Sequence, residues 1–197
     1  MALPYEVFTL ITPKDILMIY VFLAQGFEEI EALATVDVLR RCGLEVTLTA
    51  VGDALNVKGA HQMEVTADAH INDIEPSGGD ALVLPGGMPG SLNLLKCHRL
   101  RDMLTAHNGR EGLIAAICAA PMVLGDLGIL AGRKATCYPG FEDRLIDATH
   151  VAKLVVEDGH IITGRGPAAA VDFGCAIASR FVGAQAVTEV RKGMLFE

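Results

Sequence analysis

GLIAAICAAPMVLGDLG, the sequence of residues 112–128, predicts a buried strand that turns at once into a helix. Residues 113–117 form a short continuous apolar run, which is typical of a parallel strand covered on both faces. Pro121 stands where a first helical turn tolerates proline, and the apolar residues after it recur at helical spacing. Cys118 is therefore expected in the turn between strand and helix.

Other strands and helices alternate along the chain. Strands are expected at residues 16–24, 45–51, 81–85, 113–117, 153–157 and 160–164. A helix is expected over residues 28–43, because acidic residues open it, arginines close it and Gly43 can end it. A second helix is expected from Pro167 to Gly183. This alternation predicts an α/β fold in which a mostly parallel sheet has helices on both faces, while residues 59–68 suggest a short hairpin arm added to that sheet.

The length and composition predict a single domain. The chain has 197 residues, of which 51% are hydrophobic and 20% are charged, a balance that suits a sheet buried on both faces. Residues 1–15 precede the first expected strand, and Met18 lies inside it. We therefore expect an N-terminal extension at 1–15, for which an upstream start codon or an added segment is a sufficient explanation, and one domain at 16–197.

Charge and cysteine content narrow the class of protein. The net charge is −8 and no basic cluster exceeds two residues, so nucleic acid is not expected as a partner. The longest apolar run, residues 16–24, is too short for a bilayer, which needs about 20 residues. No secretory signal is apparent. The five cysteines are scattered without a CxxC pair, which predicts reduced thiols in a cytoplasmic protein.

Three loops are expected at the carboxyl edge of the sheet, where open parallel sheets bind ligands. They read AQGFEEIE (24–31), GGMPGS (86–91) and CAAP (118–121). A cysteine at a helix start is next to unpaired N–H groups, which favour the thiolate and would make Cys118 a nucleophile. The alternative is a packed, unreactive cysteine, because free cysteines are commonly buried.

The other two loops offer groups that could assist such a thiol. The amides of Gly86 and Gly87 could hold an oxyanion, or the two glycines could form a plain turn. Glu28 and Glu29 are most simply acids that stabilise the first turn of their helix. Glu31 is placed one turn further in, where a partly buried carboxyl would have a raised pKa and could exchange a proton with the sulfur.

Five ordered motifs together resemble the ThiJ/PfpI superfamily, in particular its DJ-1/YajL-like branch. They are FLAQGFEEIEALATVDVLRRCG, ALVLPGGMPGSLNL, AAICAAP, ATCYPGFED and ITGRGPAAAVDF. The resemblance implies a flavodoxin-like three-layer sandwich, a homodimer and a nucleophile-elbow cysteine paired with a protonated glutamate. By position these two residues are Cys118 and Glu31, with Gly86, Gly87 and Ala119 as backbone donors.

The chain departs from the animal members at Tyr138, where they carry a histidine. Tyrosine is a poor general base at neutral pH, with a pKa of about 10, so the base would be Glu31 or the thiolate itself. His61 aligns with an anion-contacting arginine of some relatives and could line the pocket mouth, or it could be a solvated loop residue.

Arg165 opens the last long helix, where a positive charge opposes the helix dipole. An acidic partner is therefore expected, with Glu28 or Glu29 as candidates. No histidine pair has HxxxH or HxH spacing, so no metal is expected, and no motif calls for a cofactor.

Two functions fit these residues. In the first, Cys118 attacks a small reactive carbonyl such as glyoxal or methylglyoxal, or its adduct on protein or nucleotide, and Glu31 shuttles the proton in a glyoxalase III or deglycase reaction. In the second, oxidation of Cys118 makes the protein an oxidative-stress sensor or redox-regulated chaperone. A PfpI-type peptidase is disfavoured because Ala119 replaces the histidine after the nucleophile, and a class I glutaminase because a later His-x-Glu is missing.

Overall fold

The computed structural model describes residues 17–196, so the expected extension at 1–15 lies outside the described residues. Seven strands form the central sheet in the order β10-β11-β7-β6-β1-β2-β5. Only β10 runs antiparallel to its neighbour in this sheet. The strands are β1 (Met18–Leu23), β2 (Glu45–Ala50), β5 (Ala69–His70), β6 (Ala81–Leu84), β7 (Leu113–Ile117), β10 (Val155–Asp158) and β11 (Ile161–Gly164).

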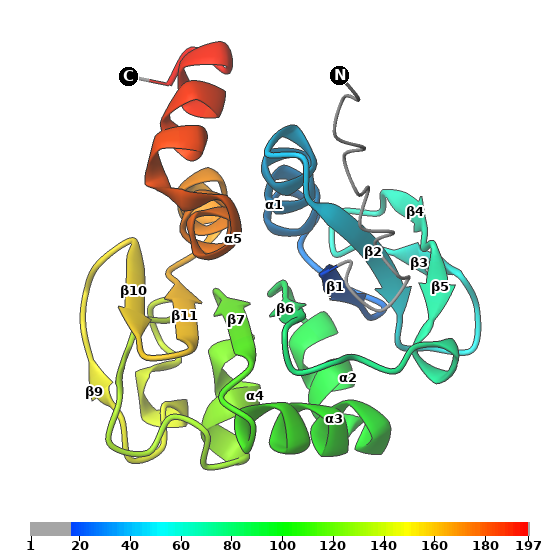
Figure 1. The fold of residues 1–197 in the computed structure, drawn as a ribbon. Helices are drawn as coiled ribbons and strands as arrows, with labels where there is room; N and C mark the ends of the chain where they lie inside the picture. Colours follow the sequence, from blue (N-terminus) through cyan, green and yellow to red (C-terminus); the bar gives the residue numbers. More distant parts are fainter. Residues whose placement is uncertain (1–16, 197) are drawn as a thin grey trace, which may run out of the picture.

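Helices cover both faces of this sheet (Figure 1). One layer holds α1 (Glu29–Arg41) and α5 (Ala170–Gly193), and the opposite layer holds α2 (Gly90–Lys96), α3 (His98–Asn108) and α4 (Pro121–Asp126). Buried apolar side chains form two clusters, because alternate residues of each strand face opposite layers. The expected three-layer sandwich of flavodoxin-like order is confirmed.

The predicted hairpin arm forms, but it does not pair with the main sheet as expected. Strands β3 (Asn56–Lys58) and β4 (Glu64–Thr66) pair with each other in a separate two-stranded sheet, so they do not extend the main one. Asp68 explains the break: its carboxylate accepts the N–H of Leu48 at 2.9 Å, so that a side chain occupies a donor of β2. The short strand β5 then forms the edge of the main sheet.

Smaller elements complete the connections between strands and helices. Strands β8 (Lys134–Ala135) and β9 (Thr149–His150) pair in parallel, and short 3₁₀ turns lie at Ile71–Asp73, Glu142–Arg144 and Pro167–Ala169. Gly183 interrupts α5 with a φ of +80°, where the sequence predicts the end of the helix. The helical residues beyond it fold back, so that Arg191 binds Asp172.

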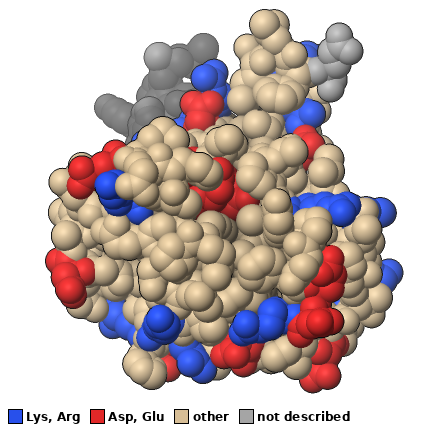
Figure 2. Space-filling view, turned by 180° about the vertical axis from the view of Figure 1, so that it is seen from behind, with Lys and Arg blue, Asp and Glu red and all other residues tan. Residues whose placement is uncertain are grey.

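The surface of the described residues is mixed in charge. Basic and acidic side chains alternate along the lower edge of the back face, which carries no continuous basic patch (Figure 2). No helix within residues 17–196 combines the length and the apolar composition that a membrane crossing requires.

Candidate active site

Cys118 lies in a strained turn directly after β7. Its φ is +65°, in the left-handed region that non-glycine residues adopt at a cost of about 1–3 kcal/mol. Two backbone hydrogen bonds hold the turn: Cys118 N–H donates to the Gly164 carbonyl at 2.9 Å, and Tyr138 N–H donates to the Cys118 carbonyl at 2.8 Å. The sequence prediction of a sharp strand-to-helix turn at this cysteine is confirmed.

Glu31 lies in the first turn of α1, with its side chain 1% exposed. The Glu28 side chain caps this helix and accepts the Glu31 N–H at 2.7 Å, which fixes where Glu31 projects. Its Oε2 accepts the Gly86 N–H at 2.8 Å, whereas its buried Oε1 has no hydrogen-bond partner among the described residues. Burial raises the pKa of Glu31 to about 7, against the lowering effect of Cys118 and the Gly86 amide.

Gly86 lies between the thiol and the carboxyl. A Cβ atom added there would be 2.6 Å from the Cβ of Cys118 and 2.6 Å from Oε2 of Glu31. Real Cβ atoms do not approach other atoms so closely, so only glycine fits at this position. The three residues from three loops therefore meet at one point of the carboxyl edge.

The pKa of the Cys118 thiol differs from the sequence expectation. Burial, followed by the negative charge of the neighbouring Glu31 carboxyl, raises the pKa of Cys118 to about 12, while the amides of Gly87 and Ala119 lower it. The prediction of a lowered pKa is wrong in direction, because α4 is only six residues long and Cys118 is 8% exposed.

The backbone donors also divide differently from expectation. The Gly86 amide is engaged by Glu31 and is not free for an oxyanion. The amides of Gly87 and Ala119 act on the Cys118 sulfur and remain the donors closest to the reacting atom. The sequence could not predict this division, because it depends on how deeply Glu31 enters the loop after β6.

We predict that Gly86→Ala moves the Glu31 carboxyl and the Cys118 thiol apart. The new methyl group must push Glu31 or Cys118 away, with an expected loss of about 1–3 kcal/mol in the free energy of unfolding. Thermal unfolding should show a drop of about 2–10 °C in Tm. Gly52→Ala is the matched control, because a Cβ there meets nothing within 4 Å. Equal Tm values for the two variants would contradict the packing described above.

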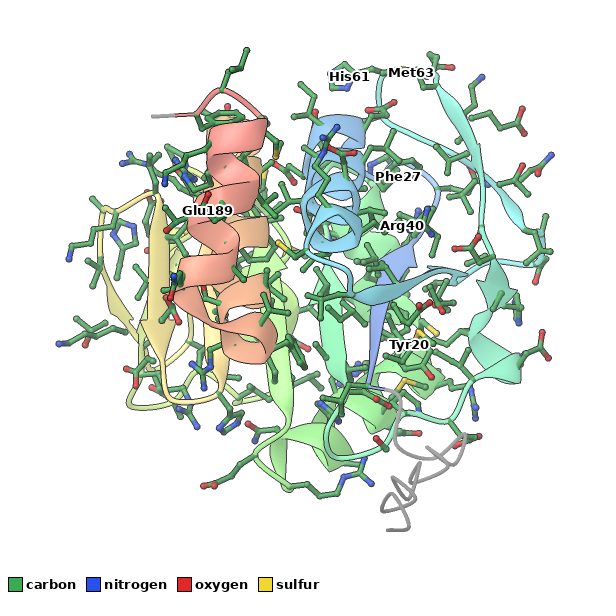
Figure 3. The ribbon with its side chains drawn as sticks, turned by 45° about the horizontal axis from the view of Figure 1, so that its top comes forward. Tyr20, Phe27, Arg40, His61, Met63 and Glu189 are labelled. Carbon is green, nitrogen blue, oxygen red and sulfur yellow. The ribbon has the colours of Figure 1, made fainter. Side chains whose placement is uncertain are left out.

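His61 lies in the loop between β3 and β4, beside the beginning of α1, and 66% of its side chain is exposed, as expected of a solvated loop residue. Its Nδ1 is 2.8 Å from Oε2 of Glu29, and its N–H donates to Oε1 of the same carboxylate at 2.7 Å. Figure 3 shows His61 and Met63 just beyond this end of the helix. The contact raises the pKa of His61 through the hydrogen bond and charge of Glu29.

The same residues form the one cluster within residues 17–196 that has the donor set for a cation. Ligand atoms of Glu28, Glu29 and His61 all lie within 4.8 Å of one another. Spacing rules could not reveal it, because His61 is some 30 residues from the glutamates in the sequence. Both oxygens of Glu29 already accept hydrogen bonds from His61, so the cluster is satisfied by its own members.

Arg165 does not have the predicted partner. Glu29 binds His61, Glu28 caps α1, and Arg165 forms no ion pair with any residue in the described part of the chain. The acid that Arg165 influences is Glu142, whose pKa is lowered mainly by the amides of Glu142 and Gly140 and in part by Arg165. The expectation of Glu28 or Glu29 is therefore wrong.

Tyr138 contributes to the site through its backbone and its ring. Its N–H fixes the Cys118 carbonyl, and its half-exposed ring packs on Gly166, where an added Cβ would lie 3.1 Å from the ring. A cavity adjoins this ring, and neither Cys118 nor Glu31 contributes to its lining.

Comparison with known proteins finds relatives that match most of the chain. The model of the DJ-1/PfpI family matches residues 18–180. Protein dj-1beta of Drosophila melanogaster is 38% identical over 177 residues, covering 89% of this chain and 95% of the relative. The crystal structure of Drosophila DJ-1beta superposes with a TM-score of 0.87 at 36% identity, over 92% of this chain and 98% of the other.

Two further relatives differ in length and name. Protein DJ-1 homolog A of Arabidopsis thaliana is 36% identical over 92% of this chain, but the chain spans only 47% of that relative's length. A protein of Caenorhabditis elegans named glutathione-independent glyoxalase DJR-1.2 is 34% identical over 84% of this chain and 88% of its own.

Proposed function

Because the chain belongs to the DJ-1/PfpI family, we propose that it acts on small reactive aldehydes, with Cys118 as nucleophile and Glu31 as proton shuttle. The observation that carries the proposal is the buried Oε1 of Glu31, which has no partner within residues 17–196 and belongs to a carboxyl that contacts Gly86 beside the strained Cys118. The similarity to a relative named as a glutathione-independent glyoxalase supports it.

The first chemical step transfers the thiol proton of Cys118 to Glu31 as the new carbon–sulfur bond forms. As the sulfur of Cys118 adds to the aldehyde carbon, the carboxylate of Glu31 takes the thiol proton, and the electrons of the carbonyl double bond move to the oxygen. The amides of Gly87 and Ala119 stabilise that oxygen, and Glu31 returns the proton to it. The product is a hemithioacetal. In an adduct of the aldehyde on a protein or nucleotide amine, the bond from sulfur to the former aldehyde carbon would form as the carbon–nitrogen bond breaks, and Glu31 would pass the thiol proton to the departing amine, as a deglycase requires.

The second step converts the adduct of an α-oxo aldehyde. Glu31 would move a proton from the former aldehyde carbon to the neighbouring carbon, while the hydroxyl proton of the hemithioacetal passes to the neighbouring carbonyl oxygen, and a thioester on Cys118 results. Water then cleaves the thioester and releases a 2-hydroxy acid. The net reaction adds one water to the aldehyde and needs no external oxidant, reductant or thiol cofactor.

Product analysis tests this proposal. Purified protein incubated with methylglyoxal and no glutathione should release lactate, which NMR spectroscopy of the reaction mixture detects. If the wild type produces lactate no faster than Cys118→Ala protein does, the proposed activity is rejected.

An oxidation-sensing role is the second candidate, because the unpartnered Oε1 of Glu31 could also donate to a sulfinate oxygen. Oxidation of the Cys118 thiol to a sulfinic acid consumes two molecules of hydrogen peroxide and releases two of water. Mass spectrometry after graded peroxide treatment separates the candidates. A sensor would gain two oxygens on Cys118 before any other cysteine, whereas the raised pKa of Cys118 favours slow oxidation.

We also propose that the protein is a homodimer joined through the start of α1. Ile30 is 56% exposed, Leu33 is 39% exposed, and Met63 of the neighbouring hairpin arm is 51% exposed. Apolar side chains gathered in this way are characteristic of protein interfaces.

Sedimentation velocity tests the dimer. We expect a species of about twice the chain mass of 20.9 kDa for the wild type and a monomer for Ile30→Arg, because a charge is not tolerated in a packed apolar interface. Ile146→Arg is the control, since Ile146 is also exposed, at 44%, but lies beside the 3₁₀ turn at Glu142–Arg144. A monomeric wild type, or equal dissociation by both variants, would contradict the proposal.

A further inference from the structure

A cavity of about 290 Å³ lies between Tyr138 and the residues that follow β11, and it is lined almost wholly by carbon atoms. We call it the side pocket. Its lining comprises Tyr138, Pro139, Leu154, Arg165, Gly166, Pro167, Ala168 and Ala169.

Both walls of the side pocket are attached to the backbone of Cys118. The Tyr138 wall is held by the bond from Tyr138 N–H to the Cys118 carbonyl, at 2.8 Å. The opposite wall begins at Arg165, directly after Gly164, whose carbonyl accepts the Cys118 N–H at 2.9 Å. Strands β7 and β11, which carry Cys118 and Arg165 at their ends, are neighbours in the sheet (Figure 1). The side pocket is thus attached through the backbone to the turn that carries Cys118, and the substituent of an aldehyde on Cys118 would reach it by extending past Tyr138.

The chemistry of the lining points to an apolar ligand. Leu154 is 51% exposed and Tyr138 is 47% exposed, so two large apolar side chains border the cavity while still open to water. The Arg165 N–H donates to the Leu154 carbonyl at 2.9 Å, which holds the Leu154 wall against the Arg165 wall. Covering this surface with an apolar group would release ordered water and stabilise the complex.

We propose that the side pocket binds the apolar substituent of the aldehyde, and that the preferred substrates are α-oxo aldehydes with an aromatic or branched group. This inference rests on the proposed function. The methyl group of methylglyoxal would leave most of a 290 Å³ cavity empty, whereas a phenyl ring would contact Tyr138, Leu154 and Pro167. Filling such a pocket typically raises kcat/KM about tenfold or more.

The kinetic test compares phenylglyoxal with methylglyoxal. The wild type should show a kcat/KM at least about tenfold higher for phenylglyoxal. Leu154→Gln, which makes one wall polar, should lower this ratio about tenfold, and Ala168→Leu, which fills the cavity, should lower it as well. Leu55→Gln is the matched control, because Leu55 is similarly exposed at 43% but does not line the cavity.

A binding measurement separates this inference from the proposed function. Acetophenone, a ketone with the same ring, should bind Cys118→Ala protein in an NMR titration and should lose at least about fivefold in affinity with Leu154→Gln but not with Leu55→Gln. If the protein turns over neither aldehyde but binds acetophenone in a way that depends on Leu154, the proposed enzymatic function is rejected and the side pocket is retained as an apolar binding site. Turnover with a ratio that does not respond to Leu154 would reject the pocket alone.

Arg165 provides the competing outcome. Its guanidinium has no ion pair among residues 17–196, so the cavity could instead select a charged aldehyde. Glyoxylate, an aldehyde that carries a carboxylate, is the probe for this case. A kcat/KM for glyoxylate above that for phenylglyoxal, lost in Arg165→Gln, would overturn the apolar assignment.

Discussion

Cys118→Ala should lower kcat/KM for methylglyoxal at least about 10³-fold, because loss of the nucleophile removes the covalent step entirely. Cys97→Ala, at a half-buried cysteine between α2 and α3, should retain the wild-type rate. The measurement is initial-rate kinetics at constant protein concentration. Comparable losses in the two variants, or a minor loss in Cys118→Ala, would show that the sulfur of Cys118 does not react with the substrate.

The same position offers a test that the loss is chemical and not a failure to fold. Because Cys118 has a φ of +65°, glycine fits this backbone better than any residue with a Cβ. Cys118→Gly should therefore unfold at a Tm equal to or above that of Cys118→Ala, while both variants are inactive. A Tm for Cys118→Gly well below that of Cys118→Ala would mean that the turn is not strained.

Local sequence signals predicted the elements but not the contacts between them. The apolar run before Cys118 and the acids before Glu31 are enough to place a strand, a helix and the turns at the sheet edge, since periodicity and helix caps are encoded within a few residues. Whether the Gly86 amide is free depends on a residue 55 positions away, and it is occupied by Glu31. The pKa of Cys118 depends on burial in the folded chain, which the helix-start argument does not include.

The prediction of a partner for Arg165 was wrong for the same reason, because contacts between distant residues are not encoded locally. Helix-dipole reasoning requires an acid near Arg165, but it cannot show that Glu29 is already bound by His61. The separate hairpin arm is a similar case, because the side chain of Asp68 occupies a donor of β2. The resemblance to a known family located Glu31 beside Cys118, yet only the structure shows that one of its oxygens lacks a partner.

Glu31→Gln should inactivate the protein and make it more stable above neutral pH. In the folded protein, burial raises the pKa of Glu31 to about 7 from its ordinary value of 4.5. The stability contribution of the protonated carboxyl is therefore fully present below pH 4.5, and it is lost as the pH rises through 7. At pH 8 this difference corresponds to about 3 kcal/mol, which glutamine avoids because it carries no charge.

Two measurements check this variant. Thermal unfolding at pH 8 should show a Tm about 6–12 °C above that of the wild type, with the gap closing near pH 4.5. Wild-type kcat/KM should rise with pH through an apparent pKa near 7, where the Glu31 and Cys118 pair keeps one proton and the carboxylate can act as base. In Glu31→Gln, kcat/KM should not rise with pH in this way, and at pH 8 it should be about 100-fold or more below the wild-type value.

Glu29→Gln is the control. Glu29 is a buried glutamate of the same helical turn as Glu31, but its pKa is shifted in the opposite direction. Burial acts to raise the pKa of Glu29, but hydrogen bonds from the His61 side chain and from backbone amides lower it overall. Its stability contribution is therefore present above pH 4.5 and is lost as the pH falls, so Glu29→Gln should destabilise the protein at pH 8. If Glu31→Gln were equally destabilising there, the Glu31 carboxylate would be satisfied in the fold and could not serve as the base for Cys118.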